Sequence, residues 1–115
     1  MHEQRIKRAR FGQQAIRSTR VEAKEIEFLR VKGDSMKDAH ILSGDLALIR
    51  QQPTAENGEI VVARVHQSDA TLKRFFRRAS RIVLKAENPK YDPIEAAGND
   101  VEVVGKLIGI YRKVV

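Results

Sequence analysis

The sequence predicts a mainly β protein with about seven strands in a single domain. Two observations carry this prediction: β-branched and aliphatic residues come in short runs, and turn-forming residues separate these runs at spacings of about 10–15 residues. Patterns typical of helices are few. With 115 residues, of which 42% are hydrophobic, the chain can build one core. Short strands in this number are typical of a sandwich or a barrel.

Turn-forming residues mark the ends of the predicted strands. Gly33 follows the first run, Ser43-Gly44 precedes the second, and Asn57-Gly58 introduces the third. One short helical turn is expected after Asp34-Ser35, at residues 36–40, because either side chain can cap it. The predicted strands cover residues 26–31, 45–50, 59–65, 71–76, 81–86, 101–104 and 106–111.

Positive charge is concentrated near the N-terminus. The chain has 22 Lys+Arg and 15 Asp+Glu, a formal net charge of +7. Residues 1–20 contain six Lys/Arg and a single acid, Glu3, and so hold most of this excess. Charge runs of this kind are usually solvated. We therefore expect residues 1–24 to form a basic, flexible leader and residues 25–115 to form the folded domain.

The residue inventory excludes several kinds of site. The chain has no cysteine, which excludes a disulfide, a thiolate zinc site and a cysteine nucleophile. Its three histidines lack metal-ligand spacing and it has no glycine-rich phosphate loop, so we expect neither a metal nor a cofactor. No apolar run approaches the ~20 residues that cross a bilayer, and no secretory signal is evident. We expect a cytoplasmic protein without membrane contact.

Ser35 and Lys73 are the candidates for chemistry. Ser35 follows a predicted strand and Gly33, a junction that can project a nucleophile beside converging backbone N–H groups, although an ordinary turn or helix cap has the same pattern. Lys73 lies in a predicted strand with apolar neighbours. Its amine either reaches water or is buried, and burial favours the neutral form. A neutral amine in reach of a serine hydroxyl is a general base.

Motifs along residues 26–113 resemble the C-terminal domain of LexA-type SOS repressors. These motifs are Gly33-Asp34-Ser35-Met36, Ser43-Gly44-Asp45-Leu46, residues 57–64, Thr71-Leu72-Lys73-Arg74, residues 84–89, Asp92-Pro93-Ile94 and residues 104–112. The resemblance implies a LexA/signal-peptidase-like β fold and a self-cleaving serine endopeptidase with a Ser–Lys dyad. Ser35 matches the nucleophile and Lys73 the general base. Gly33, Asp34 and Met36 match positions that frame the nucleophile and the oxyanion site.

The resemblance also implies partners. Family members repress transcription of DNA-damage genes, form homodimers through a C-terminal strand (here about residues 106–114) and cleave themselves when RecA filaments stimulate them. They contact DNA through an N-terminal winged helix-turn-helix that needs ~60 residues. About 25 residues precede the first matching strand, so we expect DNA contact only through a domain that is missing here. The family's Ala-Gly or Cys-Gly cleavage site also has no counterpart upstream of Ser35.

Three other interpretations stay open. UmuD-type proteins share the peptidase domain, which makes a translesion-synthesis accessory module the main alternative. A signal-peptidase-like hydrolase also pairs a serine with a lysine, although no membrane anchor is evident. Residues 73–81 interleave basic and aromatic side chains, as nucleic-acid-binding patches do. Strand alternation followed by a charged hairpin turn explains the same pattern.

Overall fold

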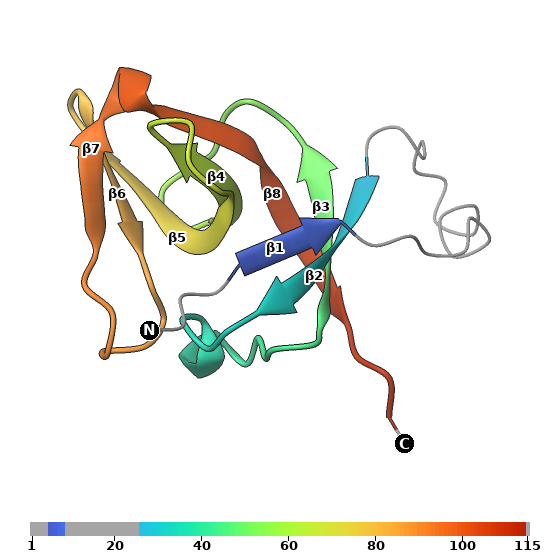
Figure 1. Cartoon of the computed structure of the whole chain (residues 1–115). Helices are drawn as coiled ribbons and strands as arrows, with labels where there is room; N and C mark the ends of the chain where they lie inside the picture. Colours follow the sequence, from blue (N-terminus) through green and yellow to red (C-terminus); the bar gives the residue numbers. More distant parts are fainter. Residues whose placement is uncertain (1–4, 9–25, 115) are drawn as a thin grey trace.

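A computed structural model describes residues 5–8 and 26–114 of the chain (Figure 1). These residues form one antiparallel sheet in the strand order β1-β2-β3-β8-β4-β5-β6-β7, which curls around the core (Figure 1). An additional pairing of β1 with β5 joins the two sides of the curl. The only helical segments among these residues are two short 3-10 turns. The predicted mainly β fold is therefore confirmed.

The described residues contain eight strands. Their bounds are β1 Arg5–Arg8, β2 Ile26–Lys32, β3 Leu46–Gln51, β4 Ile60–Val65, β5 Thr71–Arg78, β6 Arg81–Lys85, β7 Ile94–Ala97 and β8 Val101–Tyr111. The 3-10 turns are η2, Lys37–Ala39, between β2 and β3, and η3, Gly98–Asp100, between β7 and β8. No helix in these two ranges is long and apolar enough to cross a membrane.

The structure differs from the predicted strands in three places. The last two predicted strands are one strand, β8, because Gly105 continues it: with no side chain, this residue lets the Arg50 backbone of β3 approach closely. β7 begins just after Pro93 and was not predicted. β1 lies inside the basic leader, where no strand was predicted. The rest of the leader lies outside the described residues, and its flexibility stays a prediction.

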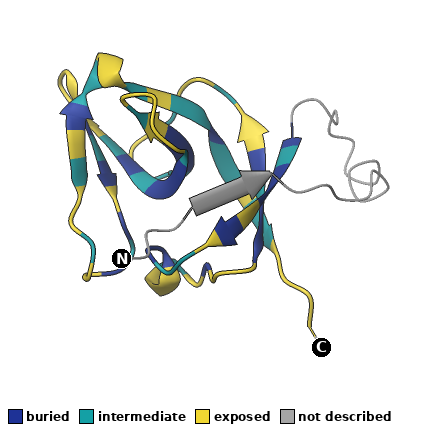
Figure 2. Ribbon diagram, in the orientation of Figure 1, coloured by how far each residue is buried: buried dark blue, intermediate teal, exposed yellow. Residues whose placement is uncertain are grey.

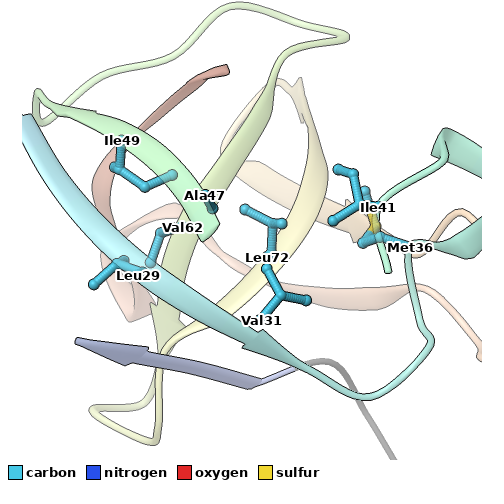
Figure 3. Close-up of a cluster of buried hydrophobic side chains, with 8 residues drawn as sticks. All are labelled: Leu29, Val31, Met36, Ile41, Ala47, Ile49, Val62 and Leu72. Carbon is cyan, nitrogen blue, oxygen red and sulfur yellow. The ribbon is translucent and has the colours of Figure 1, made fainter. Parts of the chain in front are cut away.

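Strand β8 links two parts of the core. Its C-terminal half pairs with β3 and its N-terminal half with β4. Buried positions lie along β2, β3, β4 and β5 (Figure 2), and successive residues of β4 belong to different core clusters, because they point to opposite faces of the strand. The first cluster consists of Leu29, Val31, Met36, Ile41, Ala47, Ile49, Val62 and Leu72 (Figure 3). The second consists of Val61, Ala63, Phe75, Ile82 and Leu84.

An ion pair between buried Asp45 and exposed Arg112 ties the end of β8 to the segment after η2. The Asp45 carboxylate accepts hydrogen bonds from Arg112 Nε and Nη2, both at 2.7 Å, and from the Leu42 N–H at 2.8 Å. Burial alone would raise the pKa of Asp45, but these bonds outweigh it and hold the pKa below its ordinary value. Arg112 also donates to the His40 carbonyl at 3.0 Å. The chain between η2 and β3 is thereby anchored.

Candidate functional site

The turn after β2 presents Ser35 to the interior of the fold. Gly33 has φ 90°, a left-handed conformation that glycine adopts without strain and that turns the chain out of β2. Its N–H donates to Ser43 Oγ at 3.3 Å. Met36 follows Ser35 and is fully buried in the first core cluster, where Figure 3 shows it beside Ile41. Because Met36 is anchored in this way, Ser35 has a defined position.

Lys73 reaches Ser35 from strand β5. It lies in β5, paired with Val61 of β4, and its side chain has an exposed fraction of 0%. Lys73 Nζ donates a hydrogen bond to Ser35 Oγ at 3.2 Å. Ser35 is also 0% exposed. The structure thus brings together the two candidate residues, which are separated by 38 positions in the sequence.

Thr71 is a third member of this group that sequence reasoning did not single out. It lies two residues before Lys73 in β5, so the two side chains share a face of the strand. Lys73 Nζ donates to Thr71 Oγ1 at 2.6 Å. The alternation of side chains along β5, which places residues 71 and 73 on the same face, could have indicated this contact. The amine of Lys73 thus contacts two hydroxyl groups in a site removed from water.

A loop after β6 holds the residue that precedes the serine. The Asn88 side chain donates through Nδ2 to the Asp34 carbonyl at 2.9 Å, and Tyr91 Oη donates to Asp34 Oδ1 at 2.5 Å. The hydrogen bond from Tyr91, with a smaller contribution from Lys90, lowers the pKa of Asp34. Residues 84–89 form one of the motifs of the family resemblance, but no residue among them was singled out for the site. Asn88 and Tyr91 were therefore missed as neighbours of the site.

The basic and aromatic stretch at residues 73–81 forms part of a hairpin between β5 and β6. Lys73 and Phe75 point into the fold and are 0% and 1% exposed. The Arg77 guanidinium lies 5.9 Å from the centre of the Phe75 ring. Because Phe75 packs in the second core cluster, its ring faces are not open for stacking on bases.

The residues that the structure describes contain no group of three or more His, Asp or Glu side chains that could hold a metal ion. The buried polar atoms of Ser35 and Lys73 contact each other and Thr71 instead. A hydroxyl beside a buried amine can be activated by proton transfer, without a metal.

Comparison with known proteins places this fold and site in a family. Residues 3–108 match the family model described as Peptidase S24-like. The chain therefore belongs to the Peptidase S24-like family.

The relatives narrow this class to LexA-type peptidase domains. The chain is 60% identical over 88 residues to the LexA repressor of Citrifermentans bemidjiense, covering 75% of the chain and 43% of the relative. It is 52% identical over 103 residues to the LexA repressor of Geotalea uraniireducens, covering 88% and 51%. LexA repressor 1 of Geobacter sulfurreducens is 58% identical over 87 residues, covering 74% and 43%. The chain thus spans about half the length of these relatives. The resemblance seen in the motifs is confirmed.

Proposed function

We propose that this chain is the self-cleaving serine peptidase domain of a LexA-like SOS repressor, with Ser35 as nucleophile and Lys73 as general base. The observation that carries the proposal is the 3.2 Å hydrogen bond between Lys73 Nζ and Ser35 Oγ, made where both residues are fully buried. Membership of a peptidase family supports the hydrolytic assignment. The pairing of a serine with a lysine base is a known variant of the catalytic triad.

The proposed reaction begins with proton transfer. The neutral Lys73 amine takes the proton of Ser35 Oγ while the oxygen attacks the carbonyl carbon of the scissile bond. Backbone N–H groups around Asp34 and Ser35 hold the oxyanion that forms. The Lys73 ammonium then protonates the leaving amine, which frees the C-terminal product. Water attacks the acyl-serine with the same amine as base, and the serine is regenerated.

Burial makes Lys73 suited to this role. Lys73 is fully buried, and removal from water destabilises a charged ammonium, so burial favours the neutral amine. The hydrogen bond to Thr71 Oγ1, at 2.6 Å, restricts rotation of the Lys73 amine about the Cε–Nζ bond. In the neutral amine one N–H points at Thr71, so the lone pair can face Ser35 Oγ. Thr71 is in this proposal the group that orients the base.

The proposed substrate and partners are those that the resemblance to LexA-type repressors implies. We infer that the scissile bond is an Ala-Gly or Cys-Gly bond on a loop that enters the site, that RecA filaments stimulate the cleavage, and that the protein works in the cytoplasm. Dimerisation is assigned to the C-terminal strand: Ile108 and Tyr111 of β8 and Val114 beyond it are exposed apolar side chains. Specific DNA contact is assigned to a domain outside these 115 residues. The leader, residues 1–24, is assigned no role in the chemistry.

The proposal is tested by cleavage of a loop peptide with a central Ala-Gly bond. The purified chain is incubated with the peptide at about pH 9, where a larger fraction of Lys73 is neutral, and mass spectrometry identifies the products. We expect two fragments from the unaltered chain and at least ~10³-fold slower cleavage by Ser35→Ala, because the nucleophile is gone. Ser68→Ala, in the exposed loop after β4, is the matched control. Equal cleavage by Ser35→Ala contradicts the proposal. No cleavage by the unaltered chain favours the accessory-module alternative instead.

A further inference from the structure

The loop between β6 and β7 packs against the turn that carries Ser35. In Figure 1 this loop passes next to η2. The Asp38 N–H donates to the Glu87 carbonyl at 2.8 Å, and Asn88 Nδ2 donates to the Asp34 carbonyl at 2.9 Å. Asn88 is only 4% exposed, so its amide has been removed from water to make its contacts. A buried amide with a directed hydrogen bond is a rigid constraint on its partner.

Asn88 has a fixed orientation because both ends of its amide are bonded. Its Oδ1 accepts the Lys90 N–H at 3.0 Å, which leaves Nδ2 facing the Asp34 carbonyl. The Asp34 carbonyl also accepts the Lys37 N–H at 3.2 Å. Two donors from different segments therefore hold one carbonyl. Together they fix the plane of the peptide bond between Asp34 and Ser35.

That peptide plane also determines where the Ser35 N–H points. No cis peptide bond occurs in the described residues, and in a planar trans peptide the N–H points opposite to the carbonyl. A donor that holds the Asp34 carbonyl thus aims the Ser35 N–H without touching it. This inference rests on the proposed function, in which that N–H contributes to the oxyanion site.

We propose that Asn88 is a positioning residue, which aims the Ser35 N–H at the oxyanion by holding the Asp34 carbonyl. Its effect is specific to the transition state, because the negative charge on the substrate oxygen develops only there. Without Asn88 the peptide plane can rotate, and the N–H loses alignment. Loss of a complete oxyanion donor costs about 10²–10³-fold in kcat, so misalignment of one is expected to cost about 10–100-fold.

The test uses Asn88→Asp. This variant keeps the shape of the side chain and the acceptor for the Lys90 N–H, but it cannot donate to the Asp34 carbonyl. The expected result is a fall in kcat of about 10–100-fold for the Ala-Gly peptide with KM unchanged, since peptide binding is not altered. Asn57→Asp is the matched control, because Asn57 lies in an exposed turn and accepts the Arg77 N–H at 2.7 Å. This variant is expected to have a kcat within about twofold of the unaltered value.

Asn88→Ala extends the test because it removes the donor without adding a charge. The proposal predicts the same fall in kcat for both Asn88 variants, with thermal transitions that remain cooperative. Unchanged kcat in either variant, a shifted pH midpoint in Asn88→Ala, or loss of the folded state in both overturns it. Full activity of Ser35→Ala would overturn the proposed function itself. Failure of the positioning role alone instead leaves Ser35→Ala inactive and both Asn88 variants fully active.

Discussion

Lys73→Met is expected to lower the rate of Ala-Gly peptide cleavage by about 10³–10⁴-fold, the largest effect expected of any substitution outside Ser35. Methionine has a similar length and no charge, so it can occupy the buried position of the Lys73 side chain. It has no basic nitrogen to accept the Ser35 proton. The measurement is the initial cleavage rate at about pH 9, with circular dichroism to establish that the variant is folded.

Lys73→Arg distinguishes two roles of Lys73: a general base that accepts a proton, and a positive charge alone. A guanidinium stays protonated at every accessible pH and cannot take a proton from Ser35. The variant is therefore expected to be as inactive as Lys73→Met. Lys85→Met, at an exposed position of β6, is the control and is expected to cleave at the unaltered rate. Cleavage by Lys73→Arg at more than a tenth of the unaltered rate would show that Lys73 is not the base.

Gly105→Ala is expected to destabilise the fold by about 3 kcal/mol. A Cβ at this buried position of β8 would lie 2.5 Å from the Arg50 carbonyl oxygen and 2.5 Å from Ile49 Cγ2. The carbonyl belongs to the backbone of β3, so relief requires β3 and β8 to separate. Because β8 joins β3 to β4, the displacement affects both parts of the core. Urea unfolding measures the change in the free energy of unfolding.

Gly109→Ala is the matched control in the same strand. There the nearest atoms to an added Cβ belong to Leu48 and lie 3.8 Å and 3.9 Å away, an ordinary contact distance. Its free energy of unfolding is expected to stay within about 0.5 kcal/mol of the unaltered value. Equal stability of the two variants would contradict the close approach of β3 and β8 at Gly105. The m-value should be unchanged if both variants unfold in one step.

Much of the fold could be predicted because local patterns and tertiary structure agree. Short apolar runs bounded by Gly33 and by Asn57-Gly58 became β2 and β4. β7 was missed because four residues after a proline carry too little local signal, and its pairing with β6 stabilises it. β8 was divided because glycine usually weakens a strand, whereas Gly105 fits a close contact between strands. Such contacts depend on distant residues.

The site was predictable only in part, because its contacts also join residues that are distant in the sequence. Motif resemblance indicated Ser35 and Lys73, but a separation of 38 residues contains no information about a 3.2 Å contact. The contact of Thr71 with Lys73 could have been predicted from the alternation of side chains along β5. Asn88 and Tyr91 were not, since their contacts with Asp34 span 54 and 57 residues and depend on how the β6–β7 loop folds back.

The pH dependence of cleavage tests the central claim, that a buried neutral Lys73 activates Ser35, most directly. The rate of Ala-Gly peptide cleavage by the unaltered chain is measured from about pH 6 to about pH 10. Because the neutral amine is the active form and burial favours it, the logarithm of kcat/KM should rise with a slope of about one and level off once the amine is neutral. A profile that is flat over this range, or that falls as the pH rises, would contradict the account.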